Sequence, residues 1–385
     1  MLNSNNSNLT LFVYGGNGGS GGLVSYCKGL FGSRSVPLDI DVFFICSPEF
    51  CNELGPLDSN VRIIQHSWIS NSNRLKRLIW HLWIYPRLIL KEHVDVELYV
   101  SGSLPLYRRI FHGGAIIATT CHNLLPFDLK EIERHPLNPD YRAFLRIRKE
   151  LKRSLQQLAG IIFISEHSKN VVLEQLITNP EYAVIPHGLE EKFRLERPRS
   201  YVIGEPVTLL YVSPVFPYKH HDSVVRSVKW VRDMTGRDIQ LRLVGGGGHS
   251  AVRELEALIK SEHAESYVTL VGNLGRKELS HELTSTDIFV FASSCEAFPI
   301  TLLEAMGFRL PIACSNRVGM DTMLRDAGVY FDPEDVSSLS QAIIKLLSSE
   351  EMRRDCGEKA FTYAQEYTWV NCAIETFRFL STLSR

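Results

Sequence analysis

Two glutamates, Glu296 and Glu304, lie on either side of the predicted start of a helix. The apolar run 288–292 predicts a strand, Pro299 suits a first helical turn, and Gly307 is a typical helix end. The helix would therefore begin directly beyond the carboxyl end of the strand, with its first N–H groups unbonded and favourable to an anion. The stretch predicts an anion site with a carboxylate on each side.

The order of these groups matches the order of groups in a nucleotide sugar. Glu296 would bind the sugar hydroxyls and the helix amides would bind the diphosphate. Glu304 would bind the ribose, because it lies roughly 6 to 8 Å further along the helix axis at a rise of about 1.5 Å per residue. The alternative is a pair of solvated glutamates, but the apolar surroundings of Glu304 in LLEAMGF disfavour a surface position. The residues expected to contact the diphosphate are Phe298, Pro299, Ile300 and Thr301.

The composition is typical of a soluble globular enzyme. The chain has 385 residues, of which 44% are hydrophobic and 22% charged, so two domains of roughly 150 to 200 residues are expected. The net charge of -1 disfavours bulk nucleic-acid binding, which requires a basic excess. Eight scattered cysteines without a C-x-x-C pair or zinc-site spacing predict free thiols in a reducing compartment, most simply the cytoplasm. Neither a secretory signal nor a membrane span is expected.

Short apolar runs recur at the spacing of alternating strands and helices, which predicts parallel sheets covered by helices on both faces. A polar, proline-punctuated segment, 195–206, separates two series of such runs. We therefore expect an α/β chain with doubly wound domains at 1–198 and 205–365, and ligands at the loops that follow the strands. The runs are LTLFVY, DVFFICS, VELYVSG, GAIIATTC, AGIIFIS and YAVIPHG in the first series and VTLLYVS, IQLRLVG, YVTLVGN, DIFVFAS and LPIACSN in the second.

A glycine-rich loop, YGGNGGSGG, follows the first of these runs. Gly16, Gly18 and Gly21 match the dinucleotide fingerprint G-x-G-x-x-G, which also requires a carboxylate at the end of the second strand. Asp39 and Asp41 precede the second run instead of closing it, so a nicotinamide site is disfavoured. A tight turn without a ligand and a backbone kept clear for a bulky ligand both stay open.

The stretch CEAFPITLLEAMG followed by LPIACSN resembles the nucleotide-sugar motif of glycosyltransferase family 4, which comprises retaining enzymes with the two-domain GT-B fold. AGIIFISEHSKNVV and VIPHGL resemble the end of the family's first domain, LLYVSPVFPYKHHDSVVRSV the opening of its second, and EYTWVNCAIETFRFL its last helix. The resemblance implies two Rossmann-like domains that face each other across a cleft. Residues 366–385 would form a C-terminal helix that crosses back onto the first domain.

The resemblance also implies roles for single residues. Glu296 would approach the transferred sugar, Glu304 would bind the ribose, and Lys219 would neutralise the leaving diphosphate. His122, after the run GAIIATT, matches the family's active-site histidine and would hydrogen-bond to the sugar. The glycines that would let the backbone approach phosphate and acceptor are Gly16, Gly18 and Gly19.

A second phosphate-binding cation is missing from the motif. The arginine that the family carries a few residues before Lys219 is replaced by Pro214. His220, His221 or Arg276 would have to supply that charge, and the sequence does not select among them. The resemblance implies no metal or other cofactor, because Lys219 and the helix N-terminus supply the positive field.

These features predict a retaining glycosyltransferase that moves a hexose from a UDP- or GDP-sugar to a glycan or lipid-linked acceptor in the synthesis of cell-surface polysaccharide or lipopolysaccharide. Donors of hydrogen bonds aimed at the phosphates would lower the barrier as charge develops on the leaving group. A nucleotide-sugar epimerase, a sugar phosphorylase and a non-catalytic nucleotide-sugar-binding protein are alternatives with the same shape. A phosphorylase should carry a pyridoxal lysine, for which no segment stands out.

Two basic segments of the first domain, 74–91 and 142–153, combine cationic and apolar side chains. The first has five basic and no acidic side chains interleaved with Trp80, Trp83 and Tyr85, and the second has six basic and one acidic. Such segments suit peripheral attachment to anionic lipid at the inner face of the cytoplasmic membrane. They equally suit amphipathic helices that pack on the sheet and keep their basic faces in water.

Overall fold

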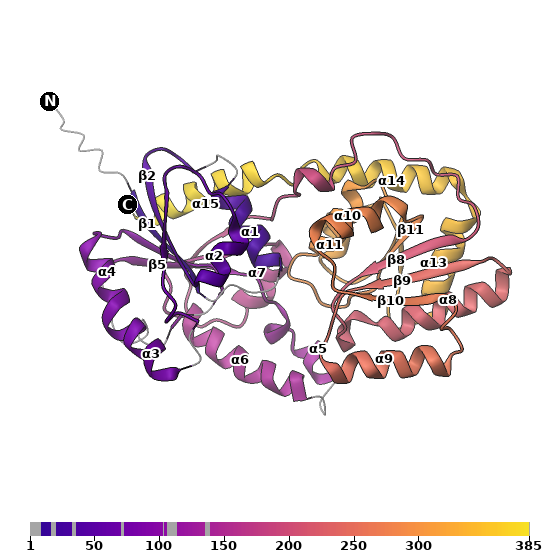
Figure 1. The fold of residues 1–385 in the computed structure, drawn as a ribbon, viewed down its shortest axis with the longest axis horizontal. Helices are drawn as coiled ribbons and strands as arrows, with labels where there is room; N and C mark the ends of the chain where they lie inside the picture. Colours follow the sequence, from indigo (N-terminus) through magenta and orange to yellow (C-terminus); the bar gives the residue numbers. More distant parts are fainter. Residues whose placement is uncertain are drawn as a thin grey trace. The chain divides into compact units, whose positions relative to one another are not determined.

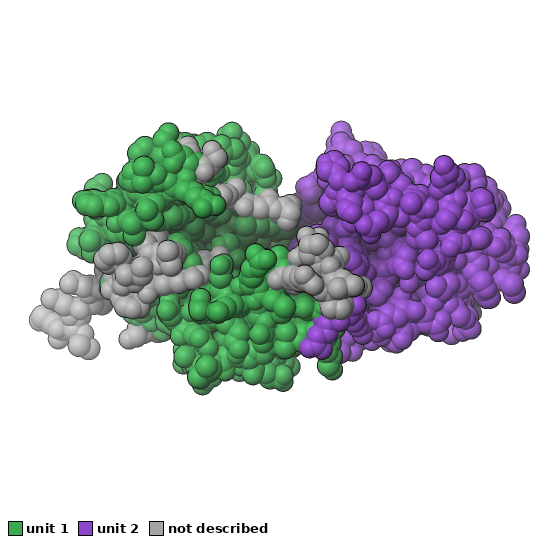
Figure 2. Space-filling model, turned by 90° about the horizontal axis from the view of Figure 1, so that it is seen from below, with its two compact units in different colours: residues 1–132, 136–188, 368–385 green, residues 133–135, 189–367 purple. Residues whose placement is uncertain are grey.

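The chain forms two compact units in a computed structural model (Figure 1; Figure 2). Unit 1 consists of residues 1–132, 136–188 and 368–385, and unit 2 of residues 133–135 and 189–367. The chain therefore leaves unit 1 after Gly188, ten residues before the boundary that we predicted at 198. The structure describes residues 9–16, 21–32, 36–70, 73–102, 104–105, 114–134 and 139–384.

Unit 1 is built on a parallel sheet of seven strands in the order β3-β2-β1-β4-β5-β6-β7. The order reverses between β1 and β4, so the loops at the carboxyl ends of the central strands are the expected place for a ligand. The strands are β1 (Leu9–Gly16), β2 (Ile40–Cys46), β3 (Val61–Gln65), β4 (Val96–Tyr99), β5 (Ile116–Cys121), β6 (Gly160–Phe163) and β7 (Glu181–Val184).

Helices cover the sheet of unit 1, and the last helix of the chain is one of them. In α15 (Trp369–Leu383) the side chains of Phe377 and Leu380 join the core formed by α1 (Gly21–Phe31) and the sheet. Gly29 permits this packing, because a Cβ there would lie 2.1 Å from the ring of Trp369. The other helices within or entering unit 1 are α2 (Pro48–Leu54), α3 (Arg74–Ile79), a π-helical segment (Trp80–Ile84), α4 (Tyr85–Lys91), α5 (Leu129–Arg134), α6 (Pro139–Leu155) and α7 (Glu166–Leu173).

Unit 2 has a parallel sheet of six strands in the order β10-β9-β8-β11-β12-β13, which reverses between β8 and β11. Its strands are β8 (Val207–Val212), β9 (Ile239–Val244), β10 (Val268–Gly272), β11 (Ile288–Phe291), β12 (Ile312–Ser315) and β13 (Val329–Phe331). Its helices are α8 (His221–Thr235), α9 (His249–Ser261), α10 (Arg276–Ser285), α11 (Ile300–Gly307), α12 (Met320–Leu324), α13 (Val336–Ser348) and α14 (Glu350–Ala364), with 3-10 turns η4 (Glu191–Phe193) and η5 (Pro217–Lys219). The two doubly wound sheets are those that the sequence predicts.

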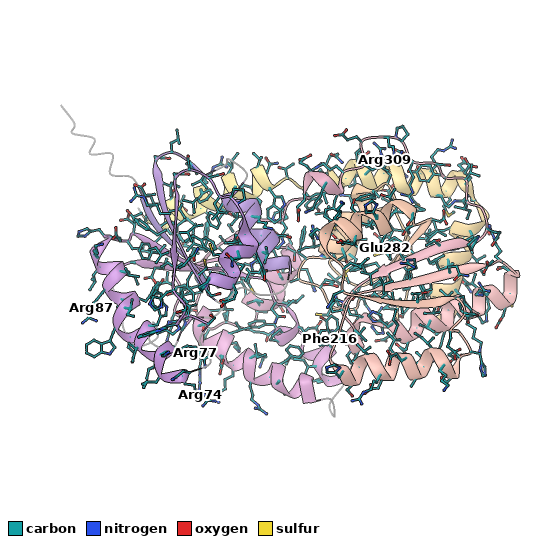
Figure 3. All side chains as sticks on the ribbon, in the orientation of Figure 1. Arg74, Arg77, Arg87, Phe216, Glu282 and Arg309 are labelled. Carbon is teal, nitrogen blue, oxygen red and sulfur yellow. The ribbon has the colours of Figure 1, made fainter. Side chains whose placement is uncertain are left out.

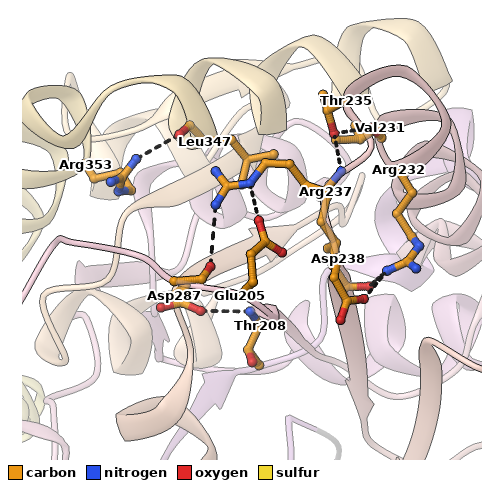
Figure 4. Close-up of polar contacts among 12 residues, drawn as sticks. Glu205, Thr208, Val231, Arg232, Thr235, Arg237, Asp238, Asp287, Leu347 and Arg353 are labelled. Atoms are coloured by element: carbon orange, nitrogen blue, oxygen red, sulfur yellow. Dashed lines mark hydrogen bonds and ion pairs between the residues drawn. The ribbon is translucent and has the colours of Figure 1, made fainter.

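The polar segment 195–206 is part of unit 2. Tyr201 is buried, and its hydroxyl donates to the carbonyl of Arg309 at 3.2 Å. Glu205 accepts a 2.7 Å bond from Arg237 (Figure 4). The polarity and prolines that suggested a linker therefore belong to a segment fixed by contacts with residues far along the chain.

Two strands have no counterpart among the predicted runs. β3 has only intermediate and exposed residues, and its Ile63 is 38% exposed. β13 has three residues, and both strands lie at an edge of their sheet. An edge strand is covered less than a central one, so it lacks the continuous apolar run by which central strands are recognised. All eight cysteines are free thiols, as predicted.

Candidate functional site

The loops that follow β8 and β11 meet at the point where the sheet of unit 2 reverses its order. Lys219 lies in η5 after β8, Glu296 lies in the loop after β11, and Lys219 Nζ donates to Glu296 Oε1. The lysine is 6% exposed, and the side chain of the glutamate is 15% exposed. The structure thus brings together two predicted site residues that lie 77 positions apart in sequence.

Backbone hydrogen bonds hold this ion pair in place. The hydroxyl of Tyr211 on β8 donates to the carbonyl of Lys219 at 2.8 Å. The amide and hydroxyl of Ser294 donate to the carbonyl of Tyr218 at 2.9 and 3.1 Å. Lys219 Nζ also lies 4.8 Å from the centroid of the Tyr218 ring. The Tyr211 bond thus fixes the turn after β8, and the two bonds from Ser294 fasten the loop after β11 to that turn.

The helix α11 begins at Ile300, close to the start that we predicted near Pro299. The amide of Ile300 donates to the carbonyl of Phe298 at 3.0 Å, and Pro299 has no N–H. The amides of Thr301 and Leu302 lie in the first turn of α11, where the helix itself offers an N–H group no acceptor. N–H groups in the first turn of a helix are favourable to an anion. The hydroxyl of Thr301 donates to the carbonyl of Val212 at 3.1 Å, so this side chain ties α11 to β8.

Glu304 lies one to two turns inside α11 and is 1% exposed. Its Oε1 accepts a 2.5 Å bond from Nη1 of Arg276, whose Nη2 donates to Glu190 Oε1 at 2.6 Å. Burial raises the pKa of Glu304 to about 7, although the charge of Arg276 opposes that shift. The apolar surroundings in LLEAMGF therefore correctly indicate a buried carboxylate, and the structure supplies its cation.

The missing arginine is not replaced by the histidines beside Lys219. Burial lowers the pKa of His221 to about 4 and also lowers the pKa of His220, so both rings are neutral at pH 7. Arg276 is charged, but it is shared between two carboxylates. Neither histidine therefore supplies positive charge beside Lys219, and the charge of Arg276 is balanced by Glu304 and Glu190.

His122 lies in unit 1, directly after β5, in a group of aromatic side chains. Its ring centroid is 4.7 Å from that of Tyr26 and 5.2 Å from that of His187. Burial lowers the pKa of His122 to about 4, so the ring is neutral at physiological pH. Its Nε2 is buried and has no hydrogen-bond partner among the described residues.

A cavity of about 250 Å³ opens beside His122. It is formed by the ends of β4 and β5 and by one face of α6, so it lies wholly within unit 1. Apolar walls with a few polar groups are typical of small-molecule sites. The polar lining residues are Ser101, His122, Asn123 and Glu150, and the apolar ones include Phe127, Ile147, Leu151 and Leu155.

The glycine loop after β1 is described only at its two ends. Gly16 has a φ of 62°, a left-handed conformation that favours glycine, and Gly21 begins α1. Gly18 and Gly19 lie outside the described residues. Among the residues that are described, no cluster of three or more His, Cys, Asp or Glu side chains has the arrangement of a metal site.

Comparison with known proteins gives matches along most of the chain. The family model described as "Glycosyl transferases group 1" matches residues 193–363, and the model "Glycosyltransferase Family 4" matches residues 36–193. O-antigen chain mannosyltransferase B of Escherichia coli is 24% identical over 253 residues, which are 62% of this chain and 65% of that protein. The match thus spans slightly less than two thirds of this relative.

Solved structures share the fold at low sequence identity. Sucrose-phosphate synthase from Thermosynechococcus elongatus has a TM-score of 0.78 and 16% identity, with 97% of this chain and 99% of that chain covered. HepE of Anabaena, solved in complex with UDP and glucose, has a TM-score of 0.71 and 14% identity, with 97% and 100% covered. These likenesses establish a fold of two Rossmann-like units.

Proposed function

We propose that the chain is a retaining hexosyltransferase that uses a nucleoside diphosphate sugar, because the two glycosyltransferase models, group 1 and family 4, together match residues 36–363. Family membership makes the chain a transferase. The finer statement rests chiefly on the Lys219–Glu296 pair, which lies in the loops at the switch point of unit 2, one of which leads into the N-terminus of α11. HepE binds UDP and glucose on the same fold, which supports a nucleotide-sugar donor.

On this proposal each group on unit 2 has a distinct task. The amides of Thr301 and Leu302 bind the diphosphate, and Lys219 balances the charge that grows on it. Glu296 holds hydroxyls of the transferred sugar, and Glu304 holds hydroxyls of the ribose. Both tasks require hydrogen-bond acceptors, which carboxylates supply. The donor base, UDP or GDP, is left open by these contacts.

The reaction would break the bond between the anomeric carbon and the phosphate oxygen, and the electron pair of that bond stays on the diphosphate. The acceptor oxygen then bonds to the anomeric carbon on the same face, and its proton passes to the leaving phosphate oxygen. We assign the acceptor to unit 1, with the cavity beside His122 as its candidate site. The neutral His122 would orient a hydroxyl by hydrogen bonding and would not serve as an acid.

The acceptor proposed is a glycan or lipid-linked hydroxyl in cell-surface polysaccharide synthesis. The name of the O-antigen mannosyltransferase relative supports this class. The free thiols of all eight cysteines support a cytoplasmic site of action. Nucleotide-sugar epimerisation and nucleotide-sugar binding without catalysis are the alternatives that the experiment must separate.

The test is a transfer assay with a panel of UDP- and GDP-sugars and glycan or lipid-linked acceptors. We expect one donor to be consumed with release of the nucleoside diphosphate and an α-product from an α-donor, read by nuclear magnetic resonance. Glu296→Ala should abolish product formation. Isomerised nucleotide sugar without an acceptor product would indicate an epimerase, and donor binding without turnover across the panel would indicate a binding protein.

We also propose that the segment 74–91 attaches unit 1 to anionic membranes. Leu75, Trp83 and Leu90 are 63%, 59% and 69% exposed on this segment. Trp80 and Tyr85 are buried, so these two of the three aromatic residues are not available to lipid. The segment's five cations include Arg74, Arg77 and Arg87 (Figure 3). Exposed apolar and basic side chains on one segment match the interface of an anionic bilayer.

Vesicle flotation tests this attachment. Vesicles with anionic lipid should carry the protein, neutral vesicles should not, and Leu75→Ser with Trp83→Ser should release it. Failure to float with anionic vesicles would refute the attachment and favour a helix packed on the sheet with a solvated face. In the described part of the chain, no helix combines the length and apolarity needed to cross a bilayer.

A further inference from the structure

Arg276, at the first position of α10, is held between two carboxylates. Nη1 donates to Glu304 Oε1 at 2.5 Å and Nη2 donates to Glu190 Oε1 at 2.6 Å. The guanidinium carbon lies 4.1 Å from the centroid of the Phe193 ring, which gives it a flat support. Lys192 Nζ approaches the other oxygen of Glu190 at 2.7 Å. Charges therefore alternate along a row from Lys192 to Glu304.

The carboxylate of Glu304 is closed off by its surroundings. Its side chain is 2% exposed, and Oε2 is buried with no hydrogen-bond partner among the described residues. The neighbours Leu303 and Ala305 on α11 are core residues. Arg276, by contrast, has a side chain that is 35% exposed. The partly solvated side chain of Arg276 is not enclosed by the core as Glu304 is.

We propose that Arg276 is a positioning residue that acts as a latch over Glu304, a role that rests on the proposed function. Ribose hydroxyls of the donor take the place of Nη1 on Glu304, while Nη2 keeps its bond to Glu190. The exchange leaves neither charge unpaired, because Glu304 gains hydroxyl donors and Arg276 retains one carboxylate. The movement has a low free-energy cost because no buried charge is left unpaired.

The latch also favours the ionised form of Glu304. Three charged groups face this carboxylate: Arg276 lowers its pKa, Glu190 from the loop before η4 raises it, and Lys192 from η4 lowers it. Burial has the largest influence and brings the pKa of Glu304 to about 7. Loss of Arg276 would therefore raise that pKa further and leave the carboxyl protonated at neutral pH, when it is a poorer acceptor for ribose hydroxyls.

Nucleotide binding at several pH values tests the latch. The probes are UDP and GDP, titrated into the wild type and Arg276→Met at pH 6, 7.5 and 9. The ratio of variant to wild-type Kd cancels the titration of the nucleotide phosphate itself. We expect a ratio of about 10 at pH 6, because a rise of about one unit in the pKa of Glu304 lowers its ionised fraction about tenfold relative to the wild type. At pH 9 the ratio should be one or less, because Glu304 is largely ionised in both proteins and the competing cation is gone. Arg276→Lys should bring the ratio at pH 6 back toward one.

A purely structural role for Arg276 predicts a different pattern. Binding would then weaken by the same factor at all three pH values, and that result would overturn the proposal. Arg242→Met is the matched control. Arg242 on β9 pairs, at 2.5 and 2.6 Å, with Glu282, which lies on α10 as Arg276 does (Figure 3 labels Glu282). We expect a constant ratio for this control.

Thermal unfolding without nucleotide separates this proposal from the proposed function. The folded pKa of Glu304 is raised above its ordinary value of 4.5, so the stability it contributes is present below pH 4.5 and lost as pH rises through about 7. Arg276→Met enlarges that loss, so its Tm deficit should be greater at pH 8.5 than at pH 5.5 by about 4 °C or more. Adding Glu304→Gln should remove the difference.

The outcomes discriminate between the two proposals. If neither nucleotide binds the wild type while the thermal series shows the expected pH difference, the donor assignment fails and the control of Glu304 by Arg276 stands. An equal Tm deficit at both pH values would overturn the latch itself, whether or not nucleotides bind.

Discussion

The carboxyl edges of the two sheets have the same architecture and opposite chemistry. In unit 2, the edge holds ion pairs: Lys219 with Glu296 in the loops after β8 and β11, and Arg276 at the start of α10 with the buried Glu304 of α11. In unit 1, the edge formed by the loops after β4 and β5 holds neutral rings around His122 and Tyr26, beside a cavity. Both sheets are parallel and doubly wound, so the difference lies in the loops. The fold supplies the place, and the loop residues decide which ligand fits it.

This contrast matches the two substrates of a transfer reaction. A diphosphate leaving group needs fixed positive charge, which the unit 2 edge can supply through Lys219 and the amides of α11. A hydroxyl acceptor needs neutral hydrogen-bonding groups and an apolar wall, which the unit 1 edge can supply. This division would be contradicted if substitutions at the unit 2 edge altered acceptor binding, or if substitutions at the unit 1 edge altered donor binding.

The largest effect is expected for Lys219→Met at the unit 2 edge. The change removes the cation that would balance the diphosphate and leaves Glu296 partly buried without its partner. We expect kcat to fall about 100- to 1,000-fold, as for loss of one stabilising group in a transition state. Steady-state transfer kinetics measure it, with the exposed Lys277→Met as control. A fall of less than threefold would mean that Lys219 is a structural lysine.

A smaller effect is expected for His122→Ala at the unit 1 edge. Loss of one hydrogen bond to a hydroxyl should lower kcat/KM about 10- to 100-fold. Burial lowers the pKa of His122 to about 4, so the ring stays neutral as pH rises from 5.5 to 8. The ratio of wild-type to variant rates should therefore be constant over that range. An inflection near pH 6.5 in this ratio would show that His122 titrates and acts as an acid or base.

Glu150→Gln tests whether the unit 1 cavity binds the acceptor. Glu150 on α6 is the carboxylate among the described lining residues, so its loss should raise the acceptor KM about two- to tenfold, the range of one hydrogen bond. The donor KM should not change. An effect on the donor KM alone would contradict the division of substrates between the two edges.

The smallest effect on activity is expected for Thr301→Val. The Thr301 hydroxyl donates to the carbonyl of Val212, so its loss should lower the free energy of unfolding by about 1 kcal/mol. The amide of residue 301 is retained, so the donor KM should change less than threefold. Chemical denaturation and kinetics check the two parts. A tenfold rise of KM at unchanged stability would assign the hydroxyl, and not only the amide, to the donor.

Local patterns in the sequence predicted much of the unit 2 edge. The strand β11, the start of α11 near Pro299 and its end at Gly307 follow from short-range rules of apolar runs and helix ends. Central strands were equally recognisable, because burial on both faces makes them continuously apolar. The edge strands β3 and β13 were missed, since partial exposure removes that pattern.

Partners far apart in the chain could not be predicted. Glu190 and Arg276 are separated by 86 residues, and Tyr26 and Thr120 by 94. The sequence around one residue of such a pair does not indicate which distant residue is its partner. The composition of a polar segment such as 195–206 likewise does not show whether the segment is a free linker or is bound to the rest of its unit. From the sequence alone, Arg276, His220 and His221 were equal candidates to replace the missing phosphate-binding arginine. Burial removes the charge of the two histidines, and burial is a property of the packed chain.

The sequence by itself determined the two-unit α/β fold, the order of strand, loop and helix around Glu296 and Glu304, and the family. These follow from hydrophobic periodicity and local motifs, which act over a few residues. The tertiary structure decided that Lys219 and Arg276 are the partners of these glutamates, that Glu304 is enclosed, and that His122 lies in a neutral aromatic group. Pairing and desolvation depend on which loops the sheets bring together, and that requires the whole fold.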